Sequence, residues 1–315
     1  MKPVRIGVVG VGHLGAYHAE KLDMIGECTL VGVADVRRER CLSIAEKHRC
    51  QAFFDYHELI GMVDAVTIAV PTEAHFSVAH DFLRAGIDVM VEKPLTTIIS
   101  DADALIAAAE RTGALLQVGF IERFNPAIGA LGEIITGPLF IEADRLHPFF
   151  SRGTDVDVIL DLMIHDLDII LHFVTAPLER VEAVGVSVLS NKVDIANARL
   201  TFANGCIANV TASRVTNKKM QKIRFFGMEG YNSVDYAKRE LVSLARAELS
   251  NGAVEITQNS VDVPQQDPLE MEMRAFVKSV VTRQAPAVSG KEGRKSLDVA
   301  LKISDQIMKH RERVI

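Results

Sequence analysis

The chain has 315 residues, of which 48% are apolar and 24% are charged, and its formal net charge is −6 at pH 7. This length gives room for two domains of about 150 residues, each with its own hydrophobic core. The composition is ordinary for a soluble globular protein. The negative charge gives no general attraction for nucleic acid or for an anionic membrane, so we expect neither as a partner.

The cysteines and the amino terminus give no sign of secretion. The four cysteines, at positions 28, 41, 50 and 206, lack metal-type spacing, and we expect reduced thiols, no bound metal and a cytoplasmic location. Glycines interrupt the first apolar run, which is too short for a signal peptide. No later stretch is long and apolar enough to span a bilayer.

The first third of the chain alternates strand-like and helix-like segments, the pattern of a parallel sheet with helices on both faces. Short β-branched or apolar runs predict strands at residues 6–9, 30–34, 65–70, 89–91 and 115–119. Helical stretches between them span residues 13–22, 38–47, 76–85 and 101–111. We therefore expect an α/β fold that starts with a doubly wound Rossmann domain over residues 1–123.

After Asn125 the pattern changes to longer alternating runs, each typical of a strand with one buried and one exposed face. These runs cover residues 140–145, 181–188, 196–202, 206–213 and 221–226, and Asn204-Gly205 predicts a hairpin between two of them. Helices are expected at residues 158–173, 269–281 and 294–309. The sequence thus predicts an α+β domain over residues 124–315 with an open-faced, mostly antiparallel sheet. Whether its final helices pack back on the first domain is left open.

A glycine motif lies between the first predicted strand and helix. Gly10-Val11-Gly12-His13-Leu14-Gly15 fits G-x-G-x-x-G in the context that gives this motif meaning. Its glycines permit a tight turn, a close approach to a pyrophosphate and close helix–strand packing, and the helix amino terminus offers N–H groups to phosphates. Gly10, Gly12, His13, Leu14 and Gly15 are therefore candidate ligands of a dinucleotide.

The next strand ends in an acid. Asp35 follows Gly15 at about the 20-residue spacing at which a carboxylate binds the adenosine ribose. The carboxylate repels a 2′-phosphate, so Asp35 favours NAD over NADP, and the adjacent Val36 is a further candidate cofactor-binding residue. Arg37 and Arg38 keep NADP open, because a guanidinium beside the ribose is able to hold that phosphate. Their alternative role is as solvated charges in the first turn of a helix.

The ends of two further predicted strands supply candidate cofactor-binding residues. Val70-Pro71-Thr72 is expected near the nicotinamide, with His75 in a supporting role or simply as a residue of the helix start. Glu92-Lys93-Pro94 follows a buried strand at the sheet edge where such folds bind ligands. A lysine there is able to exchange a proton with a substrate hydroxyl during hydride transfer. Glu92 is a candidate partner of the lysine, and the Lys93-Pro94 bond is a candidate for cis geometry.

With these motifs and Asp161-Leu-Met-Ile-His165 in view, the chain resembles the glucose-fructose oxidoreductase, inositol dehydrogenase and MocA family. The resemblance covers nearly the whole chain. It implies a Rossmann domain followed by an open-faced sheet domain, and oxidation or reduction of a sugar or polyol with a nicotinamide cofactor. It also implies catalytic roles for Lys93, Asp161 and His165.

The spacing of Asp161 and His165 supports a catalytic role for this pair independently of the resemblance. Residues at i and i+4 share one face of a helix, so Asp161 and His165 are able to point together at a substrate. An imidazole is able to take a hydroxyl proton near neutral pH, while Lys93 polarises the reacting oxygen. Taken singly, the histidine and the lysine are more often ordinary helix and surface residues. Asp166 and Asp168 are expected to be structural.

The candidate substrate-binding residues are Arg123, Asn125 and Arg152, together with Asp161 and His165. Arg123 has a second interpretation as an ion pair at the domain interface, and Arg152 as a surface charge. The segment around Arg123 looks like a branch of nucleotide-sugar 3-dehydrogenases, so the first expected substrate is UDP-N-acetylglucosamine. A free sugar or polyol such as inositol is the alternative, and a non-catalytic dinucleotide-binding regulator is a third hypothesis.

The open-faced sheet also suggests self-association. Such a sheet is expected to present a broad apolar side, and exposed apolar patches tend to be covered by another subunit. A homodimer or homotetramer is therefore expected rather than a monomer.

Overall fold

The protein is described by a computed structural model over residues 2–149, 156–228, 230–248 and 254–314. It divides into two compact units. The first comprises Met1–Ile121 and Asp267–Leu297, and the second comprises Glu122–Gln266 and Asp298–Ile315. The segment Asp267–Leu297, which the sequence placed in the second domain, therefore belongs to the first unit. The last helix, α8 (Gly290–Val314), has residues in both units.

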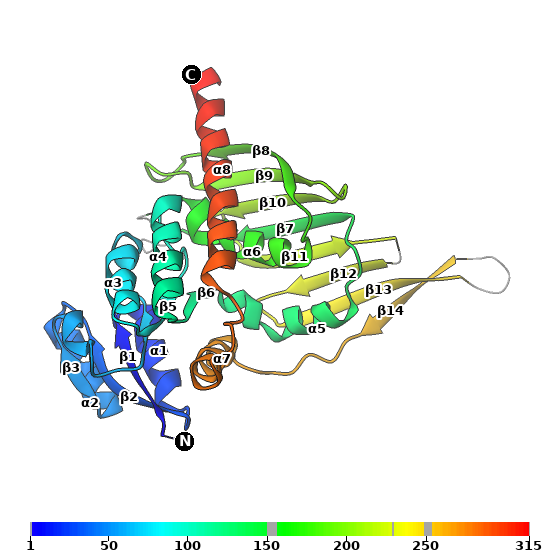
Figure 1. Cartoon of the computed structure of the whole chain (residues 1–315). Helices are drawn as coiled ribbons and strands as arrows, with labels where there is room; N and C mark the ends of the chain where they lie inside the picture. Colours follow the sequence, from blue (N-terminus) through cyan, green and yellow to red (C-terminus); the bar gives the residue numbers. More distant parts are fainter. Residues whose placement is uncertain (1, 150–155, 229, 249–253, 315) are drawn as a thin grey trace. The chain divides into compact units, whose positions relative to one another are not determined.

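The first unit, whose first strands and helices are blue to cyan in Figure 1, is built on a six-stranded parallel sheet. The strand order is β3-β2-β1-β4-β5-β6. Its strands are β1 (Val4–Val9), β2 (Cys28–Ala34), β3 (Gln51–Phe53), β4 (Ala65–Ile68), β5 (Asp88–Glu92) and β6 (Leu116–Gly119). This is the order of dinucleotide-binding Rossmann folds, so the expected doubly wound sheet is confirmed. The sequence missed β3, because three residues are too few to show an alternating pattern.

The helices of this unit are α1 (His13–Asp23), α2 (Arg38–His48), α3 (Thr72–Arg84), α4 (Ile99–Thr112) and α7 (Pro268–Thr282), with a short 3-10 turn at Tyr56–Leu59. Helix α7 joins this unit through its apolar face. Met273, Phe276 and Val277 lie in the same buried cluster as Ile6 of β1 and Leu22 of α1. Burying this face is the physical reason why a segment so late in the chain packs on the first domain.

The second unit is built on an eight-stranded sheet with the order β14-β13-β12-β11-β7-β10-β9-β8. Its strands are β7 (Phe140–Leu146), β8 (Leu178–Val186), β9 (Ile195–Phe202), β10 (Ile207–Ser213), β11 (Met220–Phe226), β12 (Gly230–Asp235), β13 (Glu240–Glu248) and β14 (Val254–Ser260). Every neighbouring pair is antiparallel except β7 with β10. The expected mostly antiparallel sheet is confirmed, but β12, β13 and β14 were not predicted. Most residues of β12 are half-buried, which leaves little contrast between its faces.

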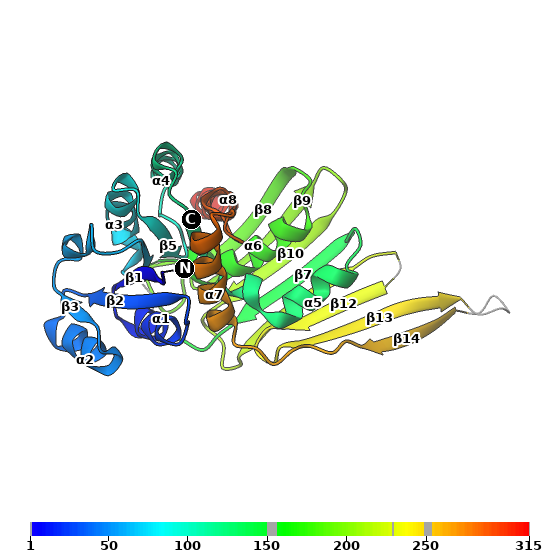
Figure 2. The same cartoon turned by 60° about the horizontal axis from the view of Figure 1, so that its bottom comes forward.

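One face of this sheet is apolar and carries helices. The helical elements of the unit are a 3-10 turn (Ile121–Phe124), α5 (Pro126–Ile134), a π-helical turn (Ile159–Met163) and α6 (Ile164–Phe173). Helix α5 packs on β12 and β13, and α6 packs on β7 and β10, as Figure 2 shows. Phe173 of α6 meets Phe225 of β11 edge to face at 5.4 Å. Gly185 of β8 leaves room for Ile307 of α8, which covers the same face.

The opposite face of the sheet is more polar than we expected. In its middle, Arg224 reaches Asp144 at 2.7 Å and Glu142 at 3.5 Å, and Arg199 donates to Asn209 at 3.1 Å. The side chains of Arg224, Asp144 and Glu142 are all half-exposed. The expectation of a broad apolar side is therefore wrong at these positions, because alternation gives this face to charged residues. None of the described helices is long and apolar enough to cross a membrane.

Candidate active site

The glycine loop has the shape that a pyrophosphate needs. Gly10 has a φ of 82°, which glycine adopts without strain, and a Cβ on Gly15 would stand 1.8 Å from the carbonyl oxygen of Gly10. The loop therefore closes onto α1 as tightly as it does only because Gly15 has no side chain. Within the described chain no side chain caps the start of α1 at Gly12, and its first turn contains no acid. The loop and the helix amino terminus thus fit a dinucleotide phosphate.

Asp35 lies where the sequence placed it, directly after β2. Its Oδ2 accepts the N–H of Val11 at 2.9 Å and its Oδ1 accepts the N–H of Arg37 at 2.8 Å. The carboxylate therefore joins the glycine loop to the start of α2. The adjacent Val36 is exposed. The structure brings Asp35 and the glycine loop together, as a site for the adenosine half of a dinucleotide requires.

The arginines that follow Asp35 differ in their surroundings. The guanidinium of Arg38 stacks over the ring of Phe54 at 3.7 Å. Arg40, which we did not single out, reaches the glycine loop, since its Nη1 lies 3.7 Å from the position of a Cβ on Gly12. The only sequence signal for Arg40 was a third arginine in the first turn of a helix. Its placement makes Arg40 a cation beside Gly12 of the loop.

Val70-Pro71-Thr72 follows the end of β4, Glu92 is the last residue of β5 with Lys93 directly after it, and the Lys93-Pro94 bond is cis. His75 joins the two segments. Its Nδ1 lies 2.8 Å from the carbonyl oxygen of Pro94, and its Nε2 lies 3.0 Å from that of Val70. Burial lowers the pKa of His75, although the two carbonyl groups act in the other direction. The buried imidazole of His75 thus connects the backbone after β4 to the backbone after β5.

Glu92 contacts a histidine that sequence reasoning missed. Its Oε1 lies 3.0 Å from Nε2 of His18 on α1, and its Oε2 accepts the backbone N–H of Lys93 at 3.3 Å. Burial acts to raise the pKa of Glu92, but the hydrogen bond from His18 and nearby positive charge outweigh it and hold that pKa below its usual value. Glu92 therefore remains a carboxylate next to Lys93. The position of His18 inside a predicted helix gave no sign that it faces β5.

Asp161 and His165 lie at the junction of two kinds of helix. Asp161 is in the π-helical turn, and His165 is in the first turn of α6. Both residues are half-exposed. The expected helix is confirmed, but its first turn is π-helical, which side-chain periodicity does not predict. Such turns occur frequently at functional sites, because they alter the direction of the side chains that they carry.

The neighbouring acids point into the unit instead. Asp166 receives two hydrogen bonds from Arg145 of β7, at 2.8 and 3.0 Å, and both side chains are buried. Burial acts to lower the pKa of Arg145, but the carboxylates of Asp166 and Glu122 hold it above its usual value. Asp168 pairs with Arg123 at 2.6 Å. These two acids therefore anchor α6, as expected of structural residues.

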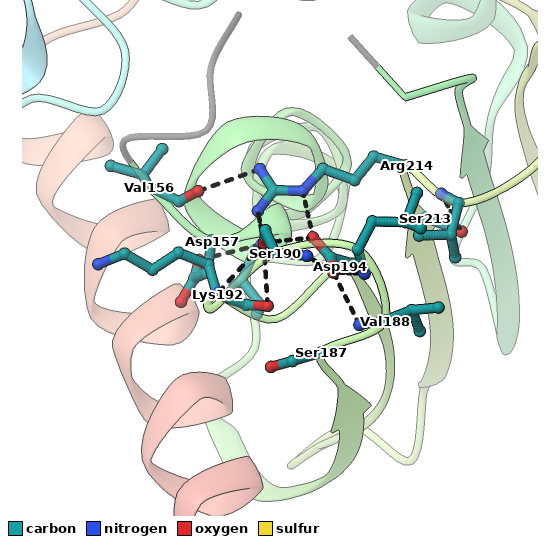
Figure 3. A network of polar contacts seen from close by, with 12 residues as sticks. Val156, Asp157, Ser187, Val188, Ser190, Lys192, Asp194, Ser213 and Arg214 are labelled. Atoms are coloured by element: carbon teal, nitrogen blue, oxygen red, sulfur yellow. Dashed lines mark hydrogen bonds and ion pairs between the residues drawn. The ribbon is translucent and has the colours of Figure 1, made fainter. Parts of the chain in front are cut away.

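A buried polar network holds the start of the same helical segment (Figure 3). Asp157 accepts the N–H groups of Ile159 and Leu160, at 3.1 and 2.9 Å. Arg214 donates to the carbonyl oxygen of Val156 at 3.1 Å and to Asp194 at 2.9 Å. The network fixes the backbone directly before the turn that carries Asp161. Its members lie far apart in sequence, so no local motif indicated it.

The structure gives surroundings for two of the candidate substrate-binding residues. Arg123 is only 7% exposed, and its guanidinium contacts Asp168 and, at 2.8 Å, Nδ1 of His172. Asn125 is buried, caps α5 through the N–H of Ala127 at 3.2 Å, and donates to the carbonyl oxygen of Tyr236 at 3.1 Å. These contacts give Arg123 an ion pair within the second unit, rather than the expected one at the domain interface, and they favour a structural role for Asn125. Arg152 lies outside the described residues.

Each of the two units contains residues that the sequence singled out as candidates for a dehydrogenase site. The first holds the glycine loop, Asp35 and Lys93, and the second holds Asp161 and His165. In the described part of the chain, no group of three or more histidine, cysteine or acidic side chains is arranged to hold a metal ion. The fold and the glycine loop are those of a nucleotide-dependent oxidoreductase.

Comparisons with known proteins narrow this class. Residues 4–120 match the family model described as an oxidoreductase family with an NAD-binding Rossmann fold, and residues 127–232 match the GFO/IDH/MocA C-terminal domain. UDP-N-acetylglucosamine 3-dehydrogenase from Acidithiobacillus ferrooxidans is 39% identical over 95% of this chain and 96% of its own. Myo-inositol 2-dehydrogenase from Thermotoga maritima is 29% identical over 93% of each chain. The chain therefore belongs to the GFO/IDH/MocA family of NAD-binding oxidoreductases.

Solved structures agree with this assignment. The UDP-N-acetylglucosamine 3-dehydrogenase from Acidithiobacillus ferrooxidans matches with a TM-score of 0.91 at 38% identity, over 98% of each chain. Levoglucosan dehydrogenase in complex with NADH matches with a TM-score of 0.86, but its 18% identity supports the fold alone. The predicted family, fold class and nicotinamide cofactor are confirmed.

Proposed function

We propose that this chain is an NAD-dependent dehydrogenase of UDP-N-acetylglucosamine that oxidises the 3-hydroxyl of the sugar. The observation that carries the proposal is the near-complete match to an enzyme of that name, at 39% identity over almost the full length of both chains. Agreement in fold over 98% of each chain supports it further, because the sheet domain is included as well as the cofactor domain.

The proposed chemistry needs one acceptor for a hydride and one for a proton. A nicotinamide, when bound, would accept the hydride that the substrate carbon loses. The hydroxyl oxygen loses its proton to the protein, so that a ketone and one proton are formed. We assign His165 as the base, with Lys93 stabilising the negative charge that develops on the oxygen. Asp161 orients the imidazole or binds an adjacent hydroxyl.

A substrate panel tests the proposal. Purified protein with NAD⁺ is supplied with UDP-N-acetylglucosamine, free N-acetylglucosamine, glucose and myo-inositol, and the formation of reduced cofactor is followed by absorbance. We expect kcat/KM to be highest for the nucleotide sugar, with the product carrying a ketone at carbon 3. Reduction with free sugars but none with the UDP-sugar contradicts the proposal.

A polyol dehydrogenase is the second candidate. The match to myo-inositol 2-dehydrogenase favours it, since that alignment also spans 93% of each chain. The lower identity, 29% against 39%, makes it the weaker hypothesis. In the same panel, turnover of myo-inositol above that of the UDP-sugar selects this function instead.

Variants test the residues assigned to the site. We expect Lys93→Ala and His165→Ala each to lower kcat by about 100- to 10,000-fold, the usual contribution of a positioned acid or base. The affinity for NADH should stay close to that of the wild type. Lys47→Ala and His57→Ala are matched controls, because both residues are exposed and pair with surface acids. Near-normal turnover of either site variant removes that residue from the scheme.

We also propose a homodimer or homotetramer. The open face of the sheet suits a second copy, because it exposes Val184 and Val186 of β8 beside its paired charges, and protein interfaces combine apolar with polar side chains. Light scattering of the purified protein tests this. A mass of 34.5 kDa for the particle in solution, which is that of one chain, contradicts it.

A cytoplasmic location completes the proposal. Cys28, Cys41, Cys50 and Cys206 are all free thiols in the structure, and three of them are buried. Reduced thiols are usual in the cytoplasm, whereas oxidising compartments favour disulfides. Fractionation of cells that express the protein tests the location, and its recovery from an oxidising compartment speaks against the cytoplasm.

A further inference from the structure

We propose that His18 is a positioning residue for Lys93, acting through the carboxylate of Glu92. The inference rests on the proposed catalytic role of the lysine and adds to it the device that directs the lysine. His18 belongs to the helix that begins at the glycine loop, so one helix serves both the cofactor site and the lysine.

The first step is the contact between His18 and Glu92. Nε2 of His18 and Oε1 of Glu92 are 3.0 Å apart, with only 1% and 12% of the two side chains exposed. A hydrogen bond to an ionised carboxylate is stronger than one between neutral groups, and burial removes the competition from water. The contact therefore holds the carboxylate of Glu92 in one orientation.

The second step is the contact between the carboxylate of Glu92 and the backbone of β6. Glu92 is paired in register with Gly119 of β6, and a Cβ on Gly119 would stand 3.1 Å from both Cδ and Oε2 of Glu92. The carboxylate thus lies against bare backbone at the end of β6. With His18 on one side and Gly119 on the other, the side chain of Glu92 has little freedom to turn.

The third step joins the carboxylate to the lysine. Oε2 of Glu92 accepts the backbone N–H of Lys93 at 3.3 Å, while His75 lies 2.8 Å from the carbonyl oxygen of Pro94. Buried histidines thus fix the backbone on both sides of Lys93, one through Glu92 and one directly. The Cα of the lysine is held in place, so its side chain starts from a defined point and direction.

A purely structural role explains His18 less well. Among the described residues, Nδ1 of His18 has no hydrogen-bond partner, and a buried polar atom in that condition costs stability. An apolar ring of similar size would fill the space without this cost. What the histidine adds at this position is its contact with Glu92.

Enzyme kinetics provide the first test. Phenylalanine at position 18 keeps a ring and removes the donor, whereas glutamine retains an N–H near the position of Nε2. We expect His18→Phe to lower kcat on the order of 10- to 100-fold, as small misplacements of a reacting group do, with KM changed much less. His18→Gln should recover most of the loss. Equal kcat for His18→Phe and the wild type overturns the proposal.

Amide hydrogen exchange provides a test that needs no substrate. We expect His18→Phe to speed exchange in the peptide that spans residues 88–97, with little change elsewhere in the protein. The matched control is His48→Phe, which breaks another buried histidine contact in the same unit, 3.0 Å from Asp23 on α1. It should leave both kcat and exchange at residues 88–97 unchanged. Uniformly faster exchange in His18→Phe indicates a general loss of stability and contradicts positioning.

The two readouts separate this inference from the proposed function. Lys93→Ala could keep its turnover while His18→Phe still speeds exchange at residues 88–97. In that case the catalytic assignment of Lys93 fails, but the role of His18 in fixing the Lys93 backbone stands. If Lys93→Ala is inactive and His18→Phe changes neither kcat nor exchange, the lysine is catalytic and the positioning role of His18 is wrong.

Discussion

Arg214 and Asp194 form a buried ion pair in which Nε and Oδ1 are 2.9 Å apart, with 5% and 0% of their side chains exposed. The second oxygen of Asp194 accepts the backbone N–H groups of Val188, Leu189 and Ser190, at 2.7, 2.7 and 2.8 Å. The arginine also reaches Val156, just before the turn with Asp161. One carboxylate therefore organises a loop and, through Arg214, the approach to a candidate catalytic residue.

Removing the charge of Asp194 should destabilise the protein strongly. Asp194→Asn removes the negative charge from a buried ion pair with Arg214, and breaking such a pair typically costs about 3–5 kcal/mol of unfolding free energy. Denaturant titration followed by circular dichroism measures the change. Glu182→Gln is the control, because Glu182 belongs to an exposed ion pair with Arg180 and its removal should cost less than about 0.5 kcal/mol. A similar small loss for Asp194→Asn contradicts this account.

The carboxylate of Asp194 should also make the free energy of unfolding depend on pH. Burial acts to raise the pKa of Asp194, but hydrogen bonds from Ser190, from the backbone and from Arg214 outweigh it and hold the pKa far below its usual value. The stabilisation is thus complete above the unfolded-state pKa of about 3.9 and is lost as the pH falls toward the folded-state value. We expect wild-type stability to fall as the pH drops below about 4 and to keep falling in stronger acid, and Asp194→Asn to flatten that fall. Parallel curves for the two proteins refute the assignment.

Gly15 should be essential for the glycine loop. In Gly15→Ala the new Cβ would stand 1.8 Å from the carbonyl oxygen of Gly10, so α1 must move away from the loop. We expect binding of NADH to weaken at least tenfold, as measured by fluorescence titration. Gly26→Ala is the control, since a Cβ at Gly26 meets nothing within 4 Å. Wild-type affinity in Gly15→Ala shows that the loop accommodates the methyl group and contradicts the prediction.

The elements around the cofactor could be predicted because their signals are local. The glycine motif, Asp35 and Lys93 each follow a short apolar run, and the structure places all three directly after strands of the parallel sheet. The order of the elements along the chain was enough to imply the Rossmann topology. Residues whose signal comes from their neighbours along the chain could thus be placed from the sequence alone.

The features that were missed depend on distant partners. The His18 contact joins residues 74 positions apart, and the ion pair of Asp194 with Arg214 spans 20. Arg123 was suited equally to a ligand or to an ion pair, and only the position of Asp168 favours the pair. The π-helical turn with Asp161 has no periodic signal of its own. Tertiary packing decides each of these, and residue type alone does not reveal it.

The charge of Asp35 should set the preference for NADH over NADPH. A carboxylate beside the ribose repels a 2′-phosphate, and at about 4 Å this repulsion is worth more than a tenfold change in affinity when partly shielded from water. We expect the wild type to bind NADH at least tenfold more tightly than NADPH. Asp35→Asn should shrink that ratio toward one, with Arg40 beside the loop available to the added phosphate.

Calorimetric titration of each variant with both cofactors measures the ratio. The amide of Asp35→Asn is able to replace only one of the two backbone contacts, to Val11 or to Arg37, so both affinities should fall together with the change in preference. The ratio is therefore the diagnostic quantity. Glu39→Gln, an exposed acid on the first turn of α2, should lower neither affinity and keep the wild-type ratio. Tighter binding of NADPH by the wild type would show that the arginines, and not Asp35, determine the choice of cofactor.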